Sequence, residues 1–124
     1  MPFIVDNQHM NGNPIKEKSY DFALQIINLY RLLIEKKEFI LSKQILRSGT
    51  SIGANVHESQ GSVSKREFYV KMQIAYKGCL ETIYWLNLLK DSQFINEKNF
   101  KELSIKSDEL RKILASIQKT SKGE

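Results

Sequence analysis

The sequence predicts an all-α fold, in which four helices pack as an antiparallel up-down-up-down four-helix bundle. Three observations lead to this prediction. Apolar residues recur at three- and four-residue spacing through four segments, short runs of turn residues separate these segments, and no segment carries a competing strand pattern. Because a short link leaves a helix only the path back along its predecessor, consecutive helices should run antiparallel.

The first 14 residues differ from the rest of the chain. They are rich in asparagine, glycine and proline and show no apolar period, so we expect residues 1–14 to form a flexible N-terminal tail. The bundle domain is then expected over residues 15–120. Its first helix should begin at about Ile15 or Ser19 and end at Lys36, with an apolar face that is unusually wide.

Capping residues place the other three helices. The second is predicted from about Leu41 to Ser59, with Ser42 as the candidate cap. Ser64 and Glu67 have the spacing of a capping box, which starts a third helix that runs to about residue 90. An asparagine at 96 or 99 should start the fourth helix, which frays near residue 122.

The composition is that of one globular domain. The chain has 124 residues, 41% of them hydrophobic and 27% charged, and a net charge of +5. No signal peptide and no apolar run of membrane-spanning length is visible, so we expect a cytoplasmic protein without a membrane partner. Cys79 is the single cysteine and lies among apolar residues, where a buried, structural thiol is expected.

Segment 48–55 has poor helix propensity, because it contains Gly49 and Gly53. The two glycines would let a neighbouring helix approach closely; a polar pocket for a ligand or another subunit is the alternative. A charge at Glu81, in the apolar half of the third helix, needs a partner, for which Arg47, Lys77, Tyr84 and Ser51 are candidates. We therefore predict a structural polar network of five residues: Ser48, Ser51, Asn55, Glu58 and Glu81.

No set of residues predicts catalysis, a metal site or a cofactor. Glu58 and Glu81 suggest a di-iron site, but the Glu-x-x-His repeat that such a site needs is missing. His57 has no nucleophile or orienting group at suitable spacing, and no glycine-rich loop follows a strand. The sequence therefore predicts a protein that is not an enzyme.

Basic residues gather between the second helix and the third. A basic surface with interleaved tyrosines is typical of a nucleic-acid interface, although an ordinary solvated face has the same appearance. The candidate contacts to RNA or DNA phosphates are Lys43, Arg47, Lys65, Arg66 and Lys71.

The same two segments carry a family resemblance. Its motif residues are Leu41-Ser42-Lys43-Gln44, Leu46-Arg47-Ser48, Ser51-Ile52-Gly53-Ala54-Asn55, Glu58, Phe68, Lys71, Ile74-Ala75, Glu81-Thr82 and Tyr84-Trp85-Leu86. This pattern resembles the four-helix-bundle proteins encoded by intervening sequences of bacterial 23S ribosomal RNA genes, over about residues 15–118. The family is in turn distantly similar to the accessory variability protein of diversity-generating retroelements, a basic pentamer that binds nucleic acid and a reverse transcriptase.

The resemblance implies a bacterial protein that assembles with itself into a homopentameric ring. Such an assembly would use the wide apolar faces of the first and third helices, and the candidate interface anchors are Tyr30, Tyr84 and Trp85. Two functions stay open. The oligomer binds RNA or DNA through its basic surface, or it is an assembly module that recruits another protein and has no nucleic-acid role.

Overall fold

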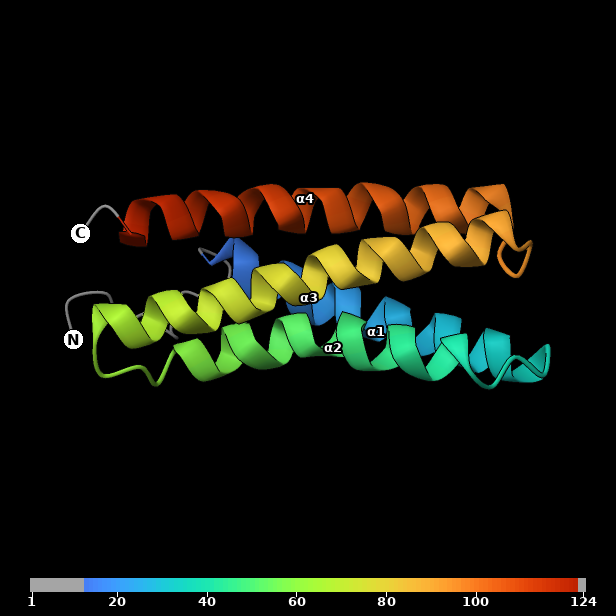
Figure 1. The fold of residues 1–124 in the computed structure, drawn as a ribbon, viewed down its shortest axis with the longest axis horizontal. Coiled ribbons are helices and arrows are strands. Elements are labelled where there is room, and N and C mark those ends of the chain that lie inside the picture. Colours follow the sequence, from blue (N-terminus) through green and yellow to red (C-terminus); the bar gives the residue numbers. More distant parts are fainter. Residues whose placement is uncertain (1–12, 123–124) are drawn as a thin grey trace.

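The computed structural model describes residues 13–122, which form four long α-helices. Their bounds are α1 (Pro14–Glu35), α2 (Leu41–Ser59), α3 (Lys65–Asp91) and α4 (Glu97–Lys122). Figure 1 shows that they run alternately up and down, joined by short turns. The predicted four-helix up-down bundle is confirmed. Most of the predicted tail, residues 1–12, lies outside the described residues.

The helices lie around the bundle in chain order. Contacts join α1 to α2, α2 to α3 and α3 to α4, and a weaker contact between α1 and α4 closes the bundle. Helix α3 is therefore diagonal to α1, which lies behind it in Figure 1. Among the described helices, none is long and apolar enough to cross a membrane.

The start of α2 differs from the prediction. Ser42 is not its cap: the Ser42 hydroxyl is buried and has no hydrogen-bond partner within residues 13–122. The carboxylate of Glu38 instead accepts hydrogen bonds from the backbone amides of Ile40, Leu41 and Ser42, at 3.2, 3.1 and 2.6 Å. Lys37, at φ 64°, adopts the left-handed conformation that turns the chain toward this cap.

The starts of the last two helices are as predicted. The Ser64 hydroxyl accepts a hydrogen bond from the amide of Glu67 at 3.0 Å, as in a capping box. The Asn96 side chain accepts one from the amide of Asn99 at 2.7 Å. Polar side chains at both positions therefore satisfy amides that a helix start leaves without a partner.

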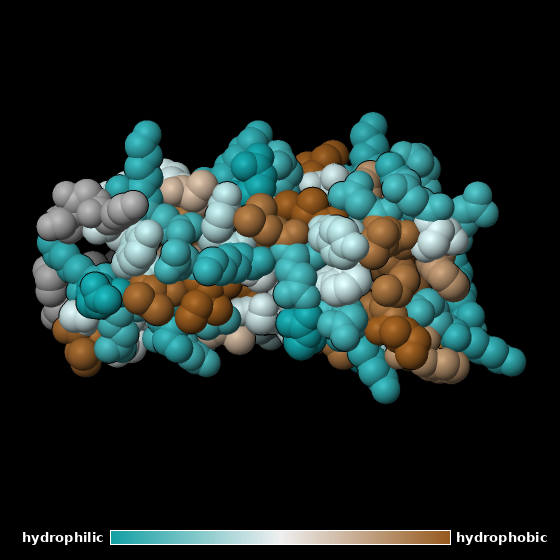
Figure 2. Space-filling model, viewed as in Figure 1, coloured by the Kyte–Doolittle hydropathy of each residue, from teal (hydrophilic) through white to brown (hydrophobic). Residues whose placement is uncertain are grey.

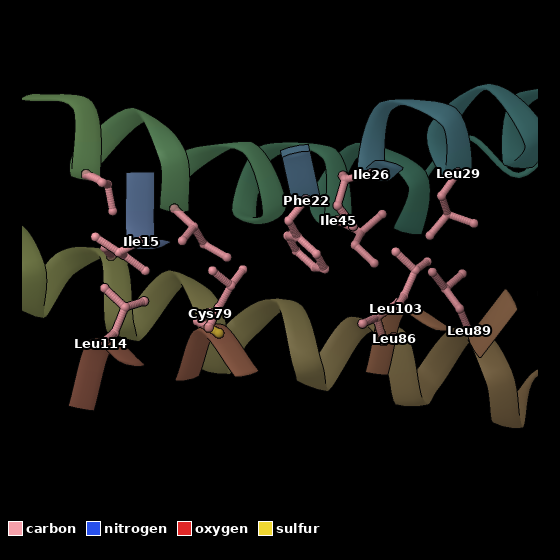
Figure 3. Packing of buried hydrophobic residues seen from close by; sticks show 14 of the residues in the cluster. Ile15, Phe22, Ile26, Leu29, Ile45, Cys79, Leu86, Leu89, Leu103 and Leu114 are labelled. Carbon is pink, nitrogen blue, oxygen red and sulfur yellow. The ribbon is translucent and has the colours of Figure 1, made fainter. Parts of the chain in front are cut away.

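The core runs the length of the bundle. Figure 3 shows Phe22 and Ile26 of α1 and Ile45 of α2 pointing toward the layer that contains Leu86 of α3 and Leu103 of α4. Cys79 belongs to this core, and its thiol donates a hydrogen bond to the Ser107 carbonyl at 3.2 Å. Burial raises the pKa of Cys79 to about 12, so the thiol stays protonated at neutral pH.

Three glycines mark close approaches between helices. A Cβ at Gly49 would lie 2.8 Å from the Ile26 side chain, and one at Gly53 would lie 3.2 Å from the Ser19 carbonyl oxygen of α1. The close packing predicted for the glycines of α2 is confirmed. Gly78 of α3 was not predicted, and a Cβ there would lie 2.7 Å from the Ser51 hydroxyl.

Candidate functional site

Apolar side chains line the solvent-facing side of α3. Six residues, spaced three or four apart along the helix, make up what we call the α3 stripe: Val70, Ile74, Lys77, Leu80, Tyr84 and Leu88. Every member except Lys77 is an exposed hydrophobic side chain, and Tyr84 is 57% exposed. The α3 stripe extends for about 27 Å at the rise of an α-helix. Figure 2 shows hydrophobic surface at several places along this side of the molecule.

The α3 stripe is not what a solvated helix face needs. A bundle helix normally buries one apolar side and presents polar residues on the opposite side. Helix α3 already buries a full apolar side, which includes Met72, Cys79 and Leu86. The additional apolar residues on its outer side are not part of the hydrophobic core of the single bundle.

Two of the three predicted interface anchors lie together. The rings of Tyr84 and Trp85 meet edge to face, with centroids 5.1 Å apart. Tyr84 points outward in the α3 stripe, whereas Trp85 is half-buried and donates an indole hydrogen bond to Glu81 at 2.9 Å. Tyr30 is half-buried on α1, diagonal to α3, so it does not join them.

The polar residues predicted as one network form separate groups. Ser48 is fully buried and accepts a hydrogen bond from the Thr82 hydroxyl at 2.9 Å. Ser51 and Asn55 bond back to carbonyls of their own helix, those of Ser48 and Ser51. The structure thus links α2 to α3 here through the Ser48–Thr82 pair.

The two acidic members form ion pairs between α2 and α3. Glu81 accepts hydrogen bonds from Arg47, one of its predicted partners, and Glu58 accepts one from Lys71 at 2.7 Å. The Arg47 hydrogen bond lowers the pKa of Glu81, and the Lys71 hydrogen bond lowers the pKa of Glu58. Both carboxylates are therefore ionised at neutral pH, and each offsets one basic residue.

The five predicted nucleic-acid contacts fall into two groups at different ends of the bundle. Lys43 and Arg47 lie near the start of α2, whereas Lys65, Arg66 and Lys71 lie near the start of α3. Lys71 pairs with Glu58 of α2, and Glu58 lies about 22 Å along this helix from Lys43. Because Arg47 and Lys71 also pair with carboxylates, the structure does not place five free cations on one surface.

Helix α4 carries exposed basic residues that were not among the predicted nucleic-acid contacts. It contains seven basic and four acidic residues, more positive charge than any other helix. Four exposed lysines of α4 have no ion-pair partner among the described residues: Lys98, Lys101, Lys106 and Lys119. The helical period of α4 was the sequence signal that could have predicted the exposure of these lysines.

A groove lies between α1 and α2 at the segment for which the sequence left a polar pocket open, but the surface of the groove is mainly apolar. It has a volume of about 760 Å³, and its floor and walls include Tyr20 and Ala23 of α1 with Gly53 and Ala54 of α2. Gly53 approaches the backbone of α1 at Ser19, and small residues therefore lie where the two helices come closest. The result is a shallow apolar hollow on the outside of the bundle.

Within residues 13–122, no three His, Cys, Asp or Glu side chains are grouped as metal ligands would be. His57 lines the groove beside Glu58. The surfaces that stand out are the α3 stripe, the groove and the lysines of α4.

Comparison with known proteins assigns the family. A family model described as 23S rRNA-intervening sequence protein matches residues 12–116. The chain belongs to this family. The assignment confirms the resemblance carried by the motif residues of α2 and α3, and the matched region of this 23S rRNA-intervening sequence protein contains α1 to α3 and most of α4.

A solved structure supports the fold of the family member. It comes from Bacteroides thetaiotaomicron and is described as a protein with unknown function from the S23 ribosomal protein family. The two chains are 47% identical, the match covers 85% of this chain and 98% of the other, and the TM-score is 0.83. No curated protein matches the chain.

Proposed function

We propose that this 23S rRNA-intervening sequence protein is a cytoplasmic, non-enzymatic scaffold that assembles with itself into a homopentameric ring. The α3 stripe is the observation that carries the proposal. Its five apolar side chains are exposed on the single chain, and contact with another subunit would remove them from water. Burial of apolar surface is the main favourable term in protein association.

Burial of the α3 stripe would contribute a substantial free energy of association. A partly exposed aliphatic or aromatic side chain contributes on the order of 1 kcal/mol when its remaining apolar surface is buried. An apolar line about 27 Å long is comparable with the interaction surfaces of oligomeric proteins. The number of five subunits rests on what the family resemblance implies, and the family match supports the resemblance itself.

The test compares two exposed apolar residues. Leu80 belongs to the α3 stripe, whereas Ile105 is exposed on α4 outside it. We expect the wild type to have the mass of a pentamer in light scattering, Leu80→Glu to dissociate, and Ile105→Glu to remain assembled. Far-UV circular dichroism should show that both variants keep their helices. A monomeric wild type, or equal loss of mass in both variants, would contradict the proposal.

Nucleic-acid binding is a second candidate function, favoured by the charge of the chain. The net charge is +5, and an assembled ring would gather several such charges on one particle. Four lysines of α4 have no ion-pair partner within residues 13–122 and are therefore available to phosphates: Lys98, Lys101, Lys106 and Lys119. Binding to RNA or DNA would then depend on phosphate neutralisation, without base reading.

A salt titration tests this second candidate. Fluorescence anisotropy with a short mixed-sequence RNA should show affinity that falls steeply with salt, with a log–log slope of about −0.7 for each phosphate neutralised. Lys101→Glu in α4 and Lys43→Glu in α2 would show which helix contributes. Affinity that does not change with salt, or absence of binding at low salt, would favour the alternative of an assembly module that recruits another protein.

A further inference from the structure

We propose that the α3 stripe of one copy packs into the groove between α1 and α2 of the next copy. This inference rests on the self-association proposed above and adds the pair of surfaces that meet. The occupant of the groove is thus a second copy of this chain. Shape, charge and position on the bundle support the pairing.

The two surfaces are complementary in shape. The α3 stripe presents large side chains, including Ile74, Leu80 and Tyr84, on the outside of a helix. The groove presents small residues, Ala23, Gly53 and Ala54, between two helices. Large side chains of one helix packed into hollows formed by neighbouring helices are the usual mode of helix packing.

The groove is also apolar enough to receive the stripe. Tyr20 lines it and is 68% exposed, and Leu24, one turn further along α1, is 45% exposed. These two residues extend the apolar surface of the groove along the outside of α1. A neighbouring helix would bury both of them together with its own apolar residues.

Charges at the two surfaces are also complementary. Lys77 is the only charged member of the α3 stripe, and it has no ion-pair partner within residues 13–122. Glu17 lines the groove, and Asp21 is exposed one turn further along α1; neither has an ion-pair partner in the described part of the chain. A lysine that enters an apolar contact needs such a carboxylate to offset the loss of water.

The position of the two surfaces decides the type of assembly. The stripe lies on α3, and the groove lies between α1 and α2, where α1 is diagonal to α3. Because the two surfaces are different and face different directions, each subunit can bind one neighbour with its stripe and another with its groove. Such a head-to-tail contact produces a closed ring or a filament, whereas a two-fold dimer requires one surface that pairs with itself.

Cross-linking of single cysteines distinguishes these arrangements. Leu80→Cys places a thiol in the stripe, and Ala54→Cys places one in the groove; both positions are exposed. Cys79 can remain, because it is fully buried and its pKa is raised to about 12, so it reacts slowly. The two variants, with different affinity tags, are co-expressed, and a short bifunctional maleimide is added to the purified assembly.

The outcomes separate this inference from the proposed function. We expect cross-linked dimers that carry both tags, and none when either variant is expressed alone. Cross-linking of Leu80→Cys alone would show a stripe-to-stripe contact and overturn the inference, while self-association itself would stand. An oligomer without any cross-link would also overturn it. A monomer would overturn both.

Charge reversal gives an independent check of the pairing. Lys77→Glu and Glu17→Lys should each weaken association by about tenfold, and the two together in one chain should restore it. Lys101→Glu, a charge reversal on α4 outside both surfaces, is the matched control. Failure of the double variant to recover affinity would show that Lys77 and Glu17 do not meet.

Discussion

Replacement of Glu38 with alanine should remove the cap at the start of α2. The Glu38 side chain is only 9% exposed, and its carboxylate accepts hydrogen bonds from three consecutive backbone amides. These amides belong to the helix start, where no carbonyl of the preceding turn is available to them. A carboxylate at this position also interacts favourably with the helix dipole.

The magnitude follows from the number of amides involved. Loss of a side-chain cap costs about 0.5–2 kcal/mol, and the value should approach 2 kcal/mol because one hydrogen bond, that to Ser42, is buried. For a protein with a urea m-value of about 2 kcal/mol/M, this corresponds to a midpoint lower by roughly 1 M.

Equilibrium urea unfolding, followed by far-UV circular dichroism, measures this loss. Glu35→Ala is the control, because Glu35 is exposed at the end of α1 and its side chain makes no hydrogen bond or ion pair with the other described residues. All proteins are compared at one concentration, since self-association would add stability. If the free energies of unfolding of Glu38→Ala and Glu35→Ala differ by less than about 0.5 kcal/mol, the capping role of Glu38 is refuted.

Three further predictions concern the packing, the thiol and the ion pairs. Gly49→Ala should lower the free energy of unfolding by about 1–3 kcal/mol, because the added Cβ would lie 2.8 Å from the buried Ile26 side chain. Gly61→Ala is the control, since a Cβ there makes only an ordinary contact. The urea midpoints of the two variants measure the difference. Cys79 should react with a thiol reagent only as the protein unfolds, so equal labelling rates in buffer and urea would contradict its burial. Basic neighbours lower the pKa of three carboxyls in the folded state: Glu58, Glu81 and Asp108. Their contribution to stability should therefore be full above about pH 4.5 and be lost as the pH falls further. Thermal melts from pH 7 to 3 measure this loss.

Local patterns were enough to predict most of the fold. The bounds of α2 and the Ser64 cap of α3 follow from residues close together in the chain, and the structure has them as predicted. The close contact at Gly49 was predictable because glycine in a helix is costly without such a contact. The Glu38 cap was not predicted, since it depends on the left-handed turn at Lys37.

The candidate surfaces were predicted less well, because they depend on how helices are arranged. Lys43 and Lys65 are close in the sequence, but α2 carries the chain from one end of the bundle to the other between them. The pairing of Lys71 with Glu58 required the register of α2 against α3, which no local pattern gives. Arg47, which pairs with Glu81, was one of the four partners predicted for this carboxylate. The Trp85 indole, which also donates a hydrogen bond to Glu81, was not among them.

The even number of helices has a consequence for any ring that this protein forms. Helix α1 begins and α4 ends toward the same end of the bundle, where the turn before Lys65 and Arg66 also lies (Figure 1). In a ring with rotational symmetry, that end points the same way in every subunit. In a ring whose bundles lie along its axis, the two rims would therefore differ. A partner approaching along the axis would meet the starts of α1 and α3 and the end of α4 on one side, and the α1–α2 and α3–α4 turns on the other.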